Sequence, residues 1–465
     1  MGLILAFLAW IGLIERAEPR PPPPRPVVKA PPAAPAAEAR PELPPPPDPL
    51  PAAQGCREAL SKDWNLRNAP WRVDGRAIWG VAGLADLRAA WGDALILVQG
   101  GDFSRAPFRG RRLRNFCFFG SDFTESDWRG AETSGVGFIG ADFSGAWLDR
   151  SRMRGLLLDT VKLDGATALG ADWRGGMLRG GPMGSLKRVR LDGADLRGFR
   201  VDCAGGSDTA CVSHWGTVSL RGADLRGADV DSLRAEVDWT GARIGGTRVS
   251  LHQLTEIGPA RRLGPLIVRA GDAEASLTLA EFRALQPFVH SRRDRLPKPV
   301  AGTRSGLRPG TANLFVETPV DFDPAFRATA LYRRLVPVLA GNPISRMLVT
   351  VRPDGRIDAE GDAVGGGDHM CGLAAKGLRL DRATGWYSGP HEPWERDPPE
   401  WRSRPMPVLR IRGDRAEAYG DGFGDHGDPR ISDYISCGAR ARFGEMVRLP
   451  LTSAAARRWS RLMLR

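Results

Sequence analysis

A large apolar residue recurs at every fifth position between residues 103 and 163, and only Thr133 interrupts the series. A period of five matches neither the 3.6-residue turn of an amphipathic helix nor the two-residue alternation of a strand. The chain must therefore turn every five residues and send one large side chain per turn into a shared interior. We expect this interior to be a continuous column, because stacked units bury faces that no single unit could bury alone. The predicted column residues of this run are Phe103, Phe108, Leu113, Phe118, Phe123, Trp128, Phe138, Phe143, Leu148, Met153, Leu158 and Leu163.

The same period continues beyond residue 163, but its register slips more than once. A small or apolar residue lies two positions before most of the large ones, and the other positions are mostly Asp, Arg, Ser and Gly. We interpret each slip as an insertion between units, with glycines supplying the tight corners. The predicted column residues of the later runs are Trp173, Leu191, Leu196, Leu220, Leu225 and Val230.

Several of these units share a five-residue form, as in Ala141–Gly145 (ADFSG), Ala171–Gly175 (ADWRG), Ala194–Gly198 (ADLRG) and Ala223–Gly227 (ADLRG). They resemble the A-(D/N)-L-x-x unit of pentapeptide-repeat proteins. That resemblance implies a right-handed quadrilateral β-helix with four units per coil over residues 100–256, about 35 Å long at a strand spacing of about 4.8 Å. The predicted fold class is mainly β: this solenoid, followed by an α+β domain with an antiparallel sheet.

The chain begins with thirteen uncharged residues, from Gly2 to Ile14, that end at Glu15. This stretch is shorter than the roughly 20 residues of a membrane-spanning helix and has the length of a signal sequence. An amphipathic or buried helix is the alternative, but apolar residues surround the whole segment instead of one stripe. We therefore predict a signal or anchor segment at residues 1–15, and an exported protein that is periplasmic or tethered to the membrane. Cleavage and anchoring both stay open.

Residues 19–51 hold 16 of the 38 prolines of the chain. Such a tract adopts polyproline II at about 3.1 Å per residue, so it could act as a spacer of up to roughly 100 Å. We predict an unfolded, Pro-rich spacer at residues 16–54. A ligand for a proline-reading groove is the alternative interpretation of Arg20–Pro26.

Three disulfides are expected from the six cysteines, and three staples fit an oxidising compartment. A metal site beside His214 is the alternative for one pair, but a second pair of ligands is missing there. The expected pairs are Cys203 with Cys211, Cys56 with an outward-facing Cys117, and Cys371 with Cys437.

Both ends of a stacked column need covering. Residues 55–99 are predicted to form an N-terminal cap with a short helix, because Val81, Leu84, Leu87 and Trp91 have helical spacing. At the other end, prolines interrupt the period, so residues 257–271 are predicted to be a linker that leaves the column axis.

Residues 272–465 lack the period of five and resemble no family that we identify. Thr278 and Glu281 form a capping box for a helix over Leu279–Val289, and Asp323 with Pro324 opens a helix that reaches Leu339. A final helix is predicted over Ser453–Leu464. The predicted strands are Arg346–Val351, Arg356–Ala359, Met370–Leu380, Gly385–Ser388, Val408–Ile411, Ala416–Tyr419 and Ile435–Phe443.

Histidines and carboxylates gather in two places of this domain. The catalytic or metal-binding candidates are Asp368, His369, Asp425 and His426, which would make the chain a secreted hydrolase or metal-dependent enzyme. The Gly-rich stretch 421–428 lacks the closing Glu of a calcium loop. Because no nucleophile elbow and no Walker loop occurs in the sequence, we expect neither turnover nor a cofactor.

The whole chain has a formal net charge of +12, and residues 100–255 carry 22 Lys plus Arg against 19 Asp plus Glu. Some pentapeptide-repeat proteins are interpreted as mimics of duplex DNA that occupy a topoisomerase, which needs an acidic column. DNA mimicry and nucleic-acid binding are therefore the lesser alternatives. We predict a non-catalytic envelope protein, whose rigid rod presents the C-terminal domain to an unidentified protein partner, and whose N-terminal segment contacts the membrane if it is not cleaved.

Overall fold

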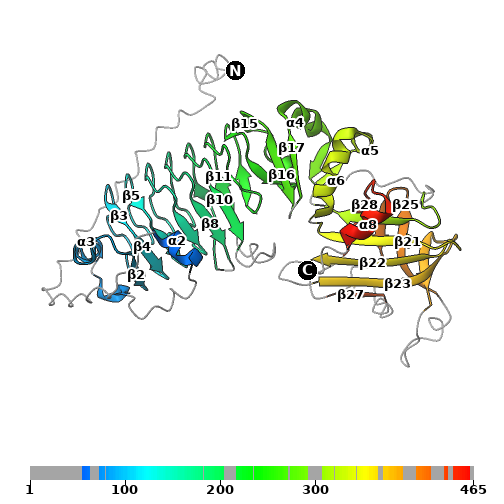
Figure 1. Cartoon of the computed structure of the whole chain (residues 1–465), viewed down its shortest axis with the longest axis horizontal. Coiled ribbons are helices and arrows are strands. Elements are labelled where there is room, and N and C mark those ends of the chain that lie inside the picture. Colours follow the sequence, from blue (N-terminus) through cyan, green and yellow to red (C-terminus); the bar gives the residue numbers. More distant parts are fainter. Residues whose placement is uncertain are drawn as a thin grey trace, which may run out of the picture. The chain divides into compact units, whose positions relative to one another are not determined.

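The computed structural model describes residues 55–62, 73–78, 80–181, 183–203, 216–233, 235–270, 273–291, 306–318, 320–341, 343–364, 370–390, 405–419, 434–437 and 443–460. The predicted signal or anchor segment and the Pro-rich spacer lie outside these ranges. Within the ranges, no helix has both the length and the apolar character needed to cross a membrane. The structure confirms the predicted fold class, since a parallel solenoid precedes an antiparallel sheet (Figure 1).

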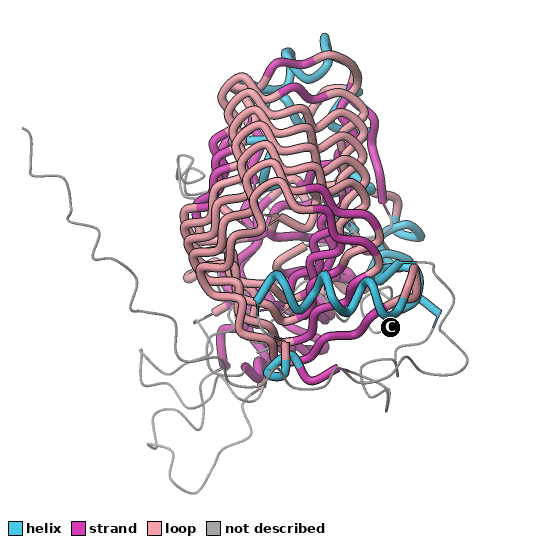
Figure 2. Tube along the Cα trace, turned by 90° about the vertical axis from the view of Figure 1, so that its left-hand side faces the viewer, coloured by secondary structure: helices cyan, strands magenta, loops and turns pink. Residues whose placement is uncertain are grey.

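Short parallel strands stack along the solenoid, and Figure 2 shows them at matching places in successive coils. One sheet has the order β1 (Val73–Asp74), β2 (Ile96–Gln99), β4 (Phe116–Phe119), β6 (Gly137–Ile139), β7 (Leu157–Asp159), β8 (Met177–Gly180) and β10 (Arg200–Cys203). The other parallel pairings join β3 (Arg112–Arg114) to β5 (Glu132–Ser134), β9 (Val189–Arg190) to β11 (Thr217–Ser219) and β12 (Glu236–Asp238), β13 (Arg243–Ile244) to β15 (Arg261–Arg262), and β14 (Arg248–Ser250) to β16 (Leu266–Ala270).

Each coil has four sides, because partners in adjacent coils are 20 residues apart and a side is five residues long. On side I, Cys117 pairs with Gly137, which pairs with Leu157. Sides II, III and IV follow in chain order, and their ladders begin at Asp102, Pro107 and Arg112. Each slip of the sequence period is an insertion that lengthens one coil and leaves the sides aligned, as where Met177 pairs with Arg200.

Aromatic rings stack inside the column. The ring of Phe123 lies between those of Phe103 and Phe143, with centroid distances of 5.1 and 4.8 Å and interplanar angles of 12°. The rings of Phe108 and Trp128 stack at 3.9 Å. All the predicted column residues are buried except Leu191, which is partly buried.

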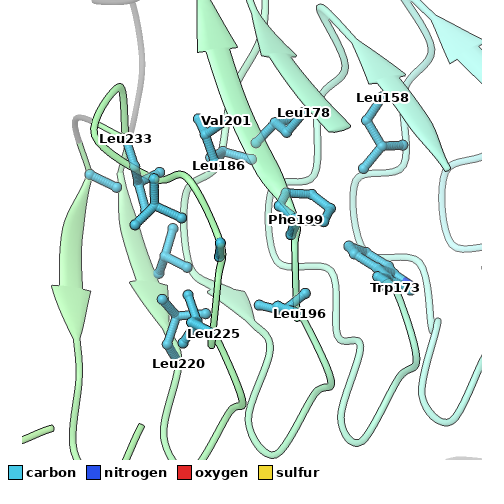
Figure 3. Packing of buried hydrophobic residues seen from close by; sticks show 14 of the residues in the cluster. Leu158, Trp173, Leu178, Leu186, Leu196, Phe199, Val201, Leu220, Leu225 and Leu233 are labelled. Atoms are coloured by element: carbon cyan, nitrogen blue, oxygen red, sulfur yellow. The ribbon is translucent and has the colours of Figure 1, made fainter. Parts of the chain in front are cut away.

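The later coils keep the same arrangement with aliphatic side chains. Figure 3 shows Leu158, Leu178 and Val201 in one row of the interior and Trp173, Leu196 and Leu225 in a second row. Successive members of the first row belong to paired strands, so the column continues across the insertion between β8 and β10.

The prediction of a linker at residues 257–271 is wrong, because this segment forms the last coil. Its strand β15 pairs with β13, and β16 pairs with β14, in parallel. Both prolines lie at corner positions: the carbonyl of Pro259 accepts from Gly241 N at 3.1 Å, and that of Pro265 accepts from Gly246 N at 2.7 Å. One coil earlier, the amide equivalent to that of Pro259 donates to a side chain, Thr240 N to Asp238 Oδ1. A residue without N–H therefore costs the ladder nothing at this corner.

Helices accompany both ends of the solenoid. Helix α3 (Gly80–Trp91) buries Leu84, Leu87 and Trp91 at the N-terminal end, and the 3₁₀ helix η2 (Gly75–Ala77) precedes it. Helix α2 (Gly55–Lys62), which the sequence pattern did not predict, packs against β4 and β6. The 3₁₀ helix η3 (His252–Thr255) precedes the last coil. Strand β17 (Ala273–Leu277) then pairs with β16 in antiparallel direction, which ends the parallel stack.

The capping box of Thr278 and Glu281 is confirmed at the start of α4 (Leu279–Leu285), which the 3₁₀ helix η4 (Gln286–Phe288) extends. Strands β18 (Val289–Ser291) and β20 (Val320–Phe322) pair next to it. The helix predicted from Asp323 to Leu339 is two helices, α5 (Pro324–Arg327) and α6 (Ala330–Gly341). The break has a local cause: Thr329 Oγ1 accepts from Tyr332 N and so starts a second helix.

Eight antiparallel strands close into a barrel, because β22 pairs with β21 on one edge and with β23 on the other. The closure was not predicted from the sequence. Helix α8 (Ser453–Ser460) packs against β19 and β21, and β27 (Ile435–Cys437) adds to the edge of β23. The strands in barrel order are β22 (Ile357–Val364), β21 (Ser345–Val351), β19 (Ala312–Glu317), β28 (Met446–Arg448), β26 (Arg415–Ala418), β25 (Met406–Arg412), β24 (Trp386–Gly389) and β23 (Met370–Leu380).

Candidate functional site

The four residues predicted as catalytic or metal-binding candidates, Asp368, His369, Asp425 and His426, lie outside the described residues. Cys211 lies outside them too, and Cys203 is the last residue of β10. In the part of the chain that the structure describes, no group of three or more His, Cys, Asp or Glu side chains is placed to hold a metal ion.

Helix α2 is fastened to the outside of side I by a disulfide. Cys56 in α2 is bonded to Cys117 in β4, with the Cα atoms 5.3 Å apart, and Cys56 N donates to Gly135 O at 2.9 Å. Cys117 faces away from the column, as expected, but α2 covers it completely. A side chain on Gly137 would place its Cβ 2.5 Å from the sulfur of Cys56, so this glycine makes room for the helix.

An apolar patch on side I explains why the helix docks there. The patch lies outside the column, is separate from its interior, and consists of Leu95, Leu97, Cys117, Phe119, Ile139, Leu157 and Met177 with Cys56 and Leu60 of α2. The sequence carried a signal for it: outward positions 20 residues apart, such as 97, 117, 157 and 177, are all apolar. A search at a period of five alone does not reveal that signal.

A hollow of about 660 Å³ lies beside α2, at the corner where side IV meets side I. Three arginines line it: Arg57 from α2, Arg154 from side IV and Arg179 from β8. Arg57 Nη1 donates to Gly175 O at 3.0 Å, which fixes the base of this side chain against a corner. Burial lowers the pKa of the Arg57 guanidinium, and the positive charges of Arg200 and Arg179 lower it further.

A second hollow of about 570 Å³ lies on side IV. Its arginines are Arg112, Arg114, Arg152 and Arg154, and Arg154 lines both hollows. Glu132 accepts from Arg112 at 3.0 Å and from Arg152 at 2.6 Å, so one carboxylate serves two guanidinium groups. We call the two joined hollows the arginine trough.

Farther along side IV, arginines and aspartates form a ladder of ion pairs. Arg174 Nε lies 2.8 Å from Asp172 and 3.4 Å from Asp195, which also binds Arg197 at 2.7 Å. Each carboxylate therefore binds an arginine two residues later and an arginine of another coil. Hydrogen bonds from Arg174 hold the pKa of Asp172 far below its ordinary value, although partial burial acts in the opposite direction.

The barrel holds the other described disulfide, Cys371 to Cys437, with Cα atoms 4.0 Å apart. Apolar side chains from its strands, including Phe315, Met347 and Leu409, form a buried cluster. One buried cation ties the final helix to the barrel: Arg346 Nε pairs with Asp362 Oδ1 at 2.8 Å, and its Nη1 donates to Trp459 O at 2.7 Å.

Comparisons with known proteins agree with this solenoid. The family model described as pentapeptide repeats matches residues 117–155 in eight copies. Among solved structures, QnrB1, a plasmid-mediated fluoroquinolone resistance protein, is similar at 18% identity over 36% of this chain and 92% of that chain, with a TM-score of 0.22. HetL, a pentapeptide-repeat protein involved in heterocyst differentiation regulation from Nostoc sp. strain PCC 7120, is similar at 19% identity over 36% and 81%, with a TM-score of 0.16. A pentapeptide-repeat protein from the thylakoid lumen of Arabidopsis thaliana is similar at 19% identity over 28% and 64%, with a TM-score of 0.12. No curated protein matches the sequence.

Proposed function

The chain is a pentapeptide-repeat protein with a β-helix fold, and from that premise we propose that it is a non-catalytic scaffold of the cell envelope. In this proposal residues 1–15 export or tether the chain, and residues 16–54 hold the folded part away from the membrane. The solenoid acts as a rigid rod, and the C-terminal barrel binds a protein partner.

The observation that carries the proposal is a disulfide in each of the two folded modules. Cys56–Cys117 joins residues 61 positions apart at the solenoid, and Cys371–Cys437 joins residues 66 positions apart at the barrel. Structural disulfides persist in oxidising compartments and are rare in the cytosol. Their presence in both modules supports export, which the apolar N-terminal stretch predicts independently.

The interior of the solenoid supports a mechanical role. Rings such as Phe103 and Phe123 are buried in the column, and ladder hydrogen bonds join each coil to the next, as Phe123 N to Asp142 O at 2.7 Å. Close-packed interiors have low compressibility and transmit strain. These properties suit a rod that presents another domain.

Export is tested by thiol trapping in living cells. The full chain and a variant without residues 1–15 are expressed, free thiols are alkylated, and the mass of the peptides with Cys56 and Cys371 is measured. The proposal predicts disulfide-linked peptides in the full chain, recovered with the envelope fraction, and alkylated thiols in the shortened variant. Alkylated thiols in the full chain would contradict export.

The scaffold role is tested by photo-crosslinking in the envelope. A photoreactive residue replaces the exposed Leu380 on the barrel, and in a control it replaces the exposed Trp147 on the solenoid. We expect one protein to be crosslinked from position 380 and not from position 147. A variant with alanine at Asp368, His369, Asp425 and His426 should keep the same partner. If that variant keeps the partner but loses the cellular role, the enzyme alternative is favoured.

A further inference from the structure

The arginine trough is a strongly charged concave surface of the solenoid. Six guanidinium groups line it, from Arg57, Arg112, Arg114, Arg152, Arg154 and Arg179, against the carboxylates of Glu58 and Glu132. The near balance of charge over the whole solenoid hides this excess, because acidic side chains lie mostly on other parts of the surface. The trough therefore has a local positive potential that an anionic ligand would neutralise.

Three features of the trough make it suitable for several anionic groups at once. The guanidinium fork binds phosphate oxygens in bidentate fashion. The side chains of Arg112, Arg152 and Arg154 are 75%, 67% and 63% exposed, so their forks are accessible. Arginines in adjacent coils are one strand spacing apart, about 4.8 Å, which repeats the positive charge along the solenoid.

The shape of the trough decides between kinds of anionic partner. Its two hollows lie on adjoining sides of a coil and share Arg154 at the corner, so a flat bilayer cannot contact both. A DNA duplex, with a persistence length of about 150 base pairs, is too stiff to follow the corner. Single-stranded nucleic acid binds on aromatic platforms, and the described residues lining the trough include no aromatic ring.

We propose that the arginine trough binds a flexible chain of phosphoryl groups without bases. The chain would run from Arg112 and Arg114 on side IV, past Arg154 at the corner, to Arg57 and Arg179 beside α2. This inference does not depend on the scaffold proposal, because it concerns the purified protein and would hold in any compartment.

The test uses the full chain, purified with its disulfides intact, and a fluorescent polyphosphate of about twenty phosphates as the probe. The variant is Arg57→Gln, Arg114→Gln and Arg154→Gln, which removes a charge from each hollow and from the shared corner. Arg114 makes no ion pair within the described part of the chain, and Asp172 keeps Arg174 when Arg154 is replaced. The matched control replaces three exposed arginines elsewhere on the solenoid, Arg109→Gln, Arg221→Gln and Arg261→Gln.

We expect the trough variant to bind polyphosphate at least tenfold more weakly, while the control changes binding less than threefold. The slope of log K against log salt should fall in magnitude by about 2 for the trough variant, because each phosphate that is no longer neutralised removes roughly 0.7 from the slope. Circular dichroism and the melting temperature verify that both variants fold. Failure of the wild type to bind, or an equally weakened affinity in both variants, would overturn the proposal.

Two further probes test the identity of the partner. Orthophosphate should compete only weakly, because it occupies one fork at a time. If a single-stranded oligonucleotide or anionic vesicles of phosphatidylglycerol bind as tightly as polyphosphate and lose affinity equally in the trough variant, the assignment to a base-free phosphate chain is wrong.

Discussion

The ring of Phe143 stacks on the ring of Phe123 with centroids 4.8 Å apart and planes inclined by 12°. These residues are 20 positions apart in sequence, one full coil of four five-residue sides. The same separation places Asp122 beside Asp142 on the outside of the coil. Interior stacking and exterior pairing therefore follow from one repeat, and a change at one position acts on the coils before and after it.

Removal of one ring from the column should be costly. Phe123 is fully buried and contacts rings of three coils, so Phe123→Ala should lower the free energy of unfolding by about 3 to 5 kcal/mol through reduced burial and a cavity. Urea unfolding followed by tryptophan fluorescence measures the change. Trp147→Ala is the control: its side chain is 45% exposed, and we expect a change of at most about 1 kcal/mol.

Removal of the solenoid disulfide should release α2 without unfolding the barrel. In the double variant Cys56→Ser and Cys117→Ser, the helix keeps only its packing and a few hydrogen bonds, and a disulfide typically contributes about 2 to 4 kcal/mol. Hydrogen exchange should therefore become faster over residues 55–62. The control, Cys371→Ser with Cys437→Ser, should instead speed exchange in β23 and β27. Unchanged exchange in α2 would refute its dependence on the disulfide.

The ion-pair ladder should make stability depend on pH in a defined direction. The folded-state pKa of Asp172 is lowered, chiefly by hydrogen bonds from Arg174, so its contribution is fully present above the unfolded pKa of about 4 and is lost as the pH falls toward the folded pKa. Asp172→Asn should cost about 1 kcal/mol at pH 7, because the pair is partly exposed to solvent. The difference from the wild type should shrink below pH 4, and a difference that grows there would contradict this assignment.

The length of an insertion should matter more than its size. A second copy of residues 136–155 adds one whole coil, so every later side keeps its place and the melting temperature should change little. A second copy of residues 141–145 adds one side and turns all later coils by a corner. That variant should melt several degrees lower or aggregate, because Leu157 and Met177 would leave the patch under α2. Equal melting temperatures would show that four sides per coil are not required.

The sequence was sufficient to predict the column because burial leaves little choice. A residue such as Phe123 or Phe143, repeated every five positions among polar neighbours, must point inward for the stack to exclude water. Helix α2 was missed because its docking patch emerges only at the period of 20. The last coil was missed because Pro259 and Pro265 were interpreted as breaks, whereas their amide positions are not used by the ladder.

The barrel and the candidate site needed three-dimensional information for different reasons. Barrel closure depends on the pairing of β22 with β23 and on strands β19 and β28, which the local pattern did not predict. The arginine trough was hidden by the net charge of residues 100–255. Arg154, in one coil, meets Arg57 only because α2 folds back on side I.

The central claim, that each coil has four five-residue sides, is tested most directly by crosslinking between coils. Asp122 and Asp142 form a parallel bridge on side II, so the double variant Asp122→Cys and Asp142→Cys should crosslink efficiently with a short thiol reagent, as mapped by peptide mass spectrometry. The double variant Asp127→Cys and Asp142→Cys, 15 residues apart and on different sides, should not. Efficient crosslinking of the second pair and none of the first would contradict the account.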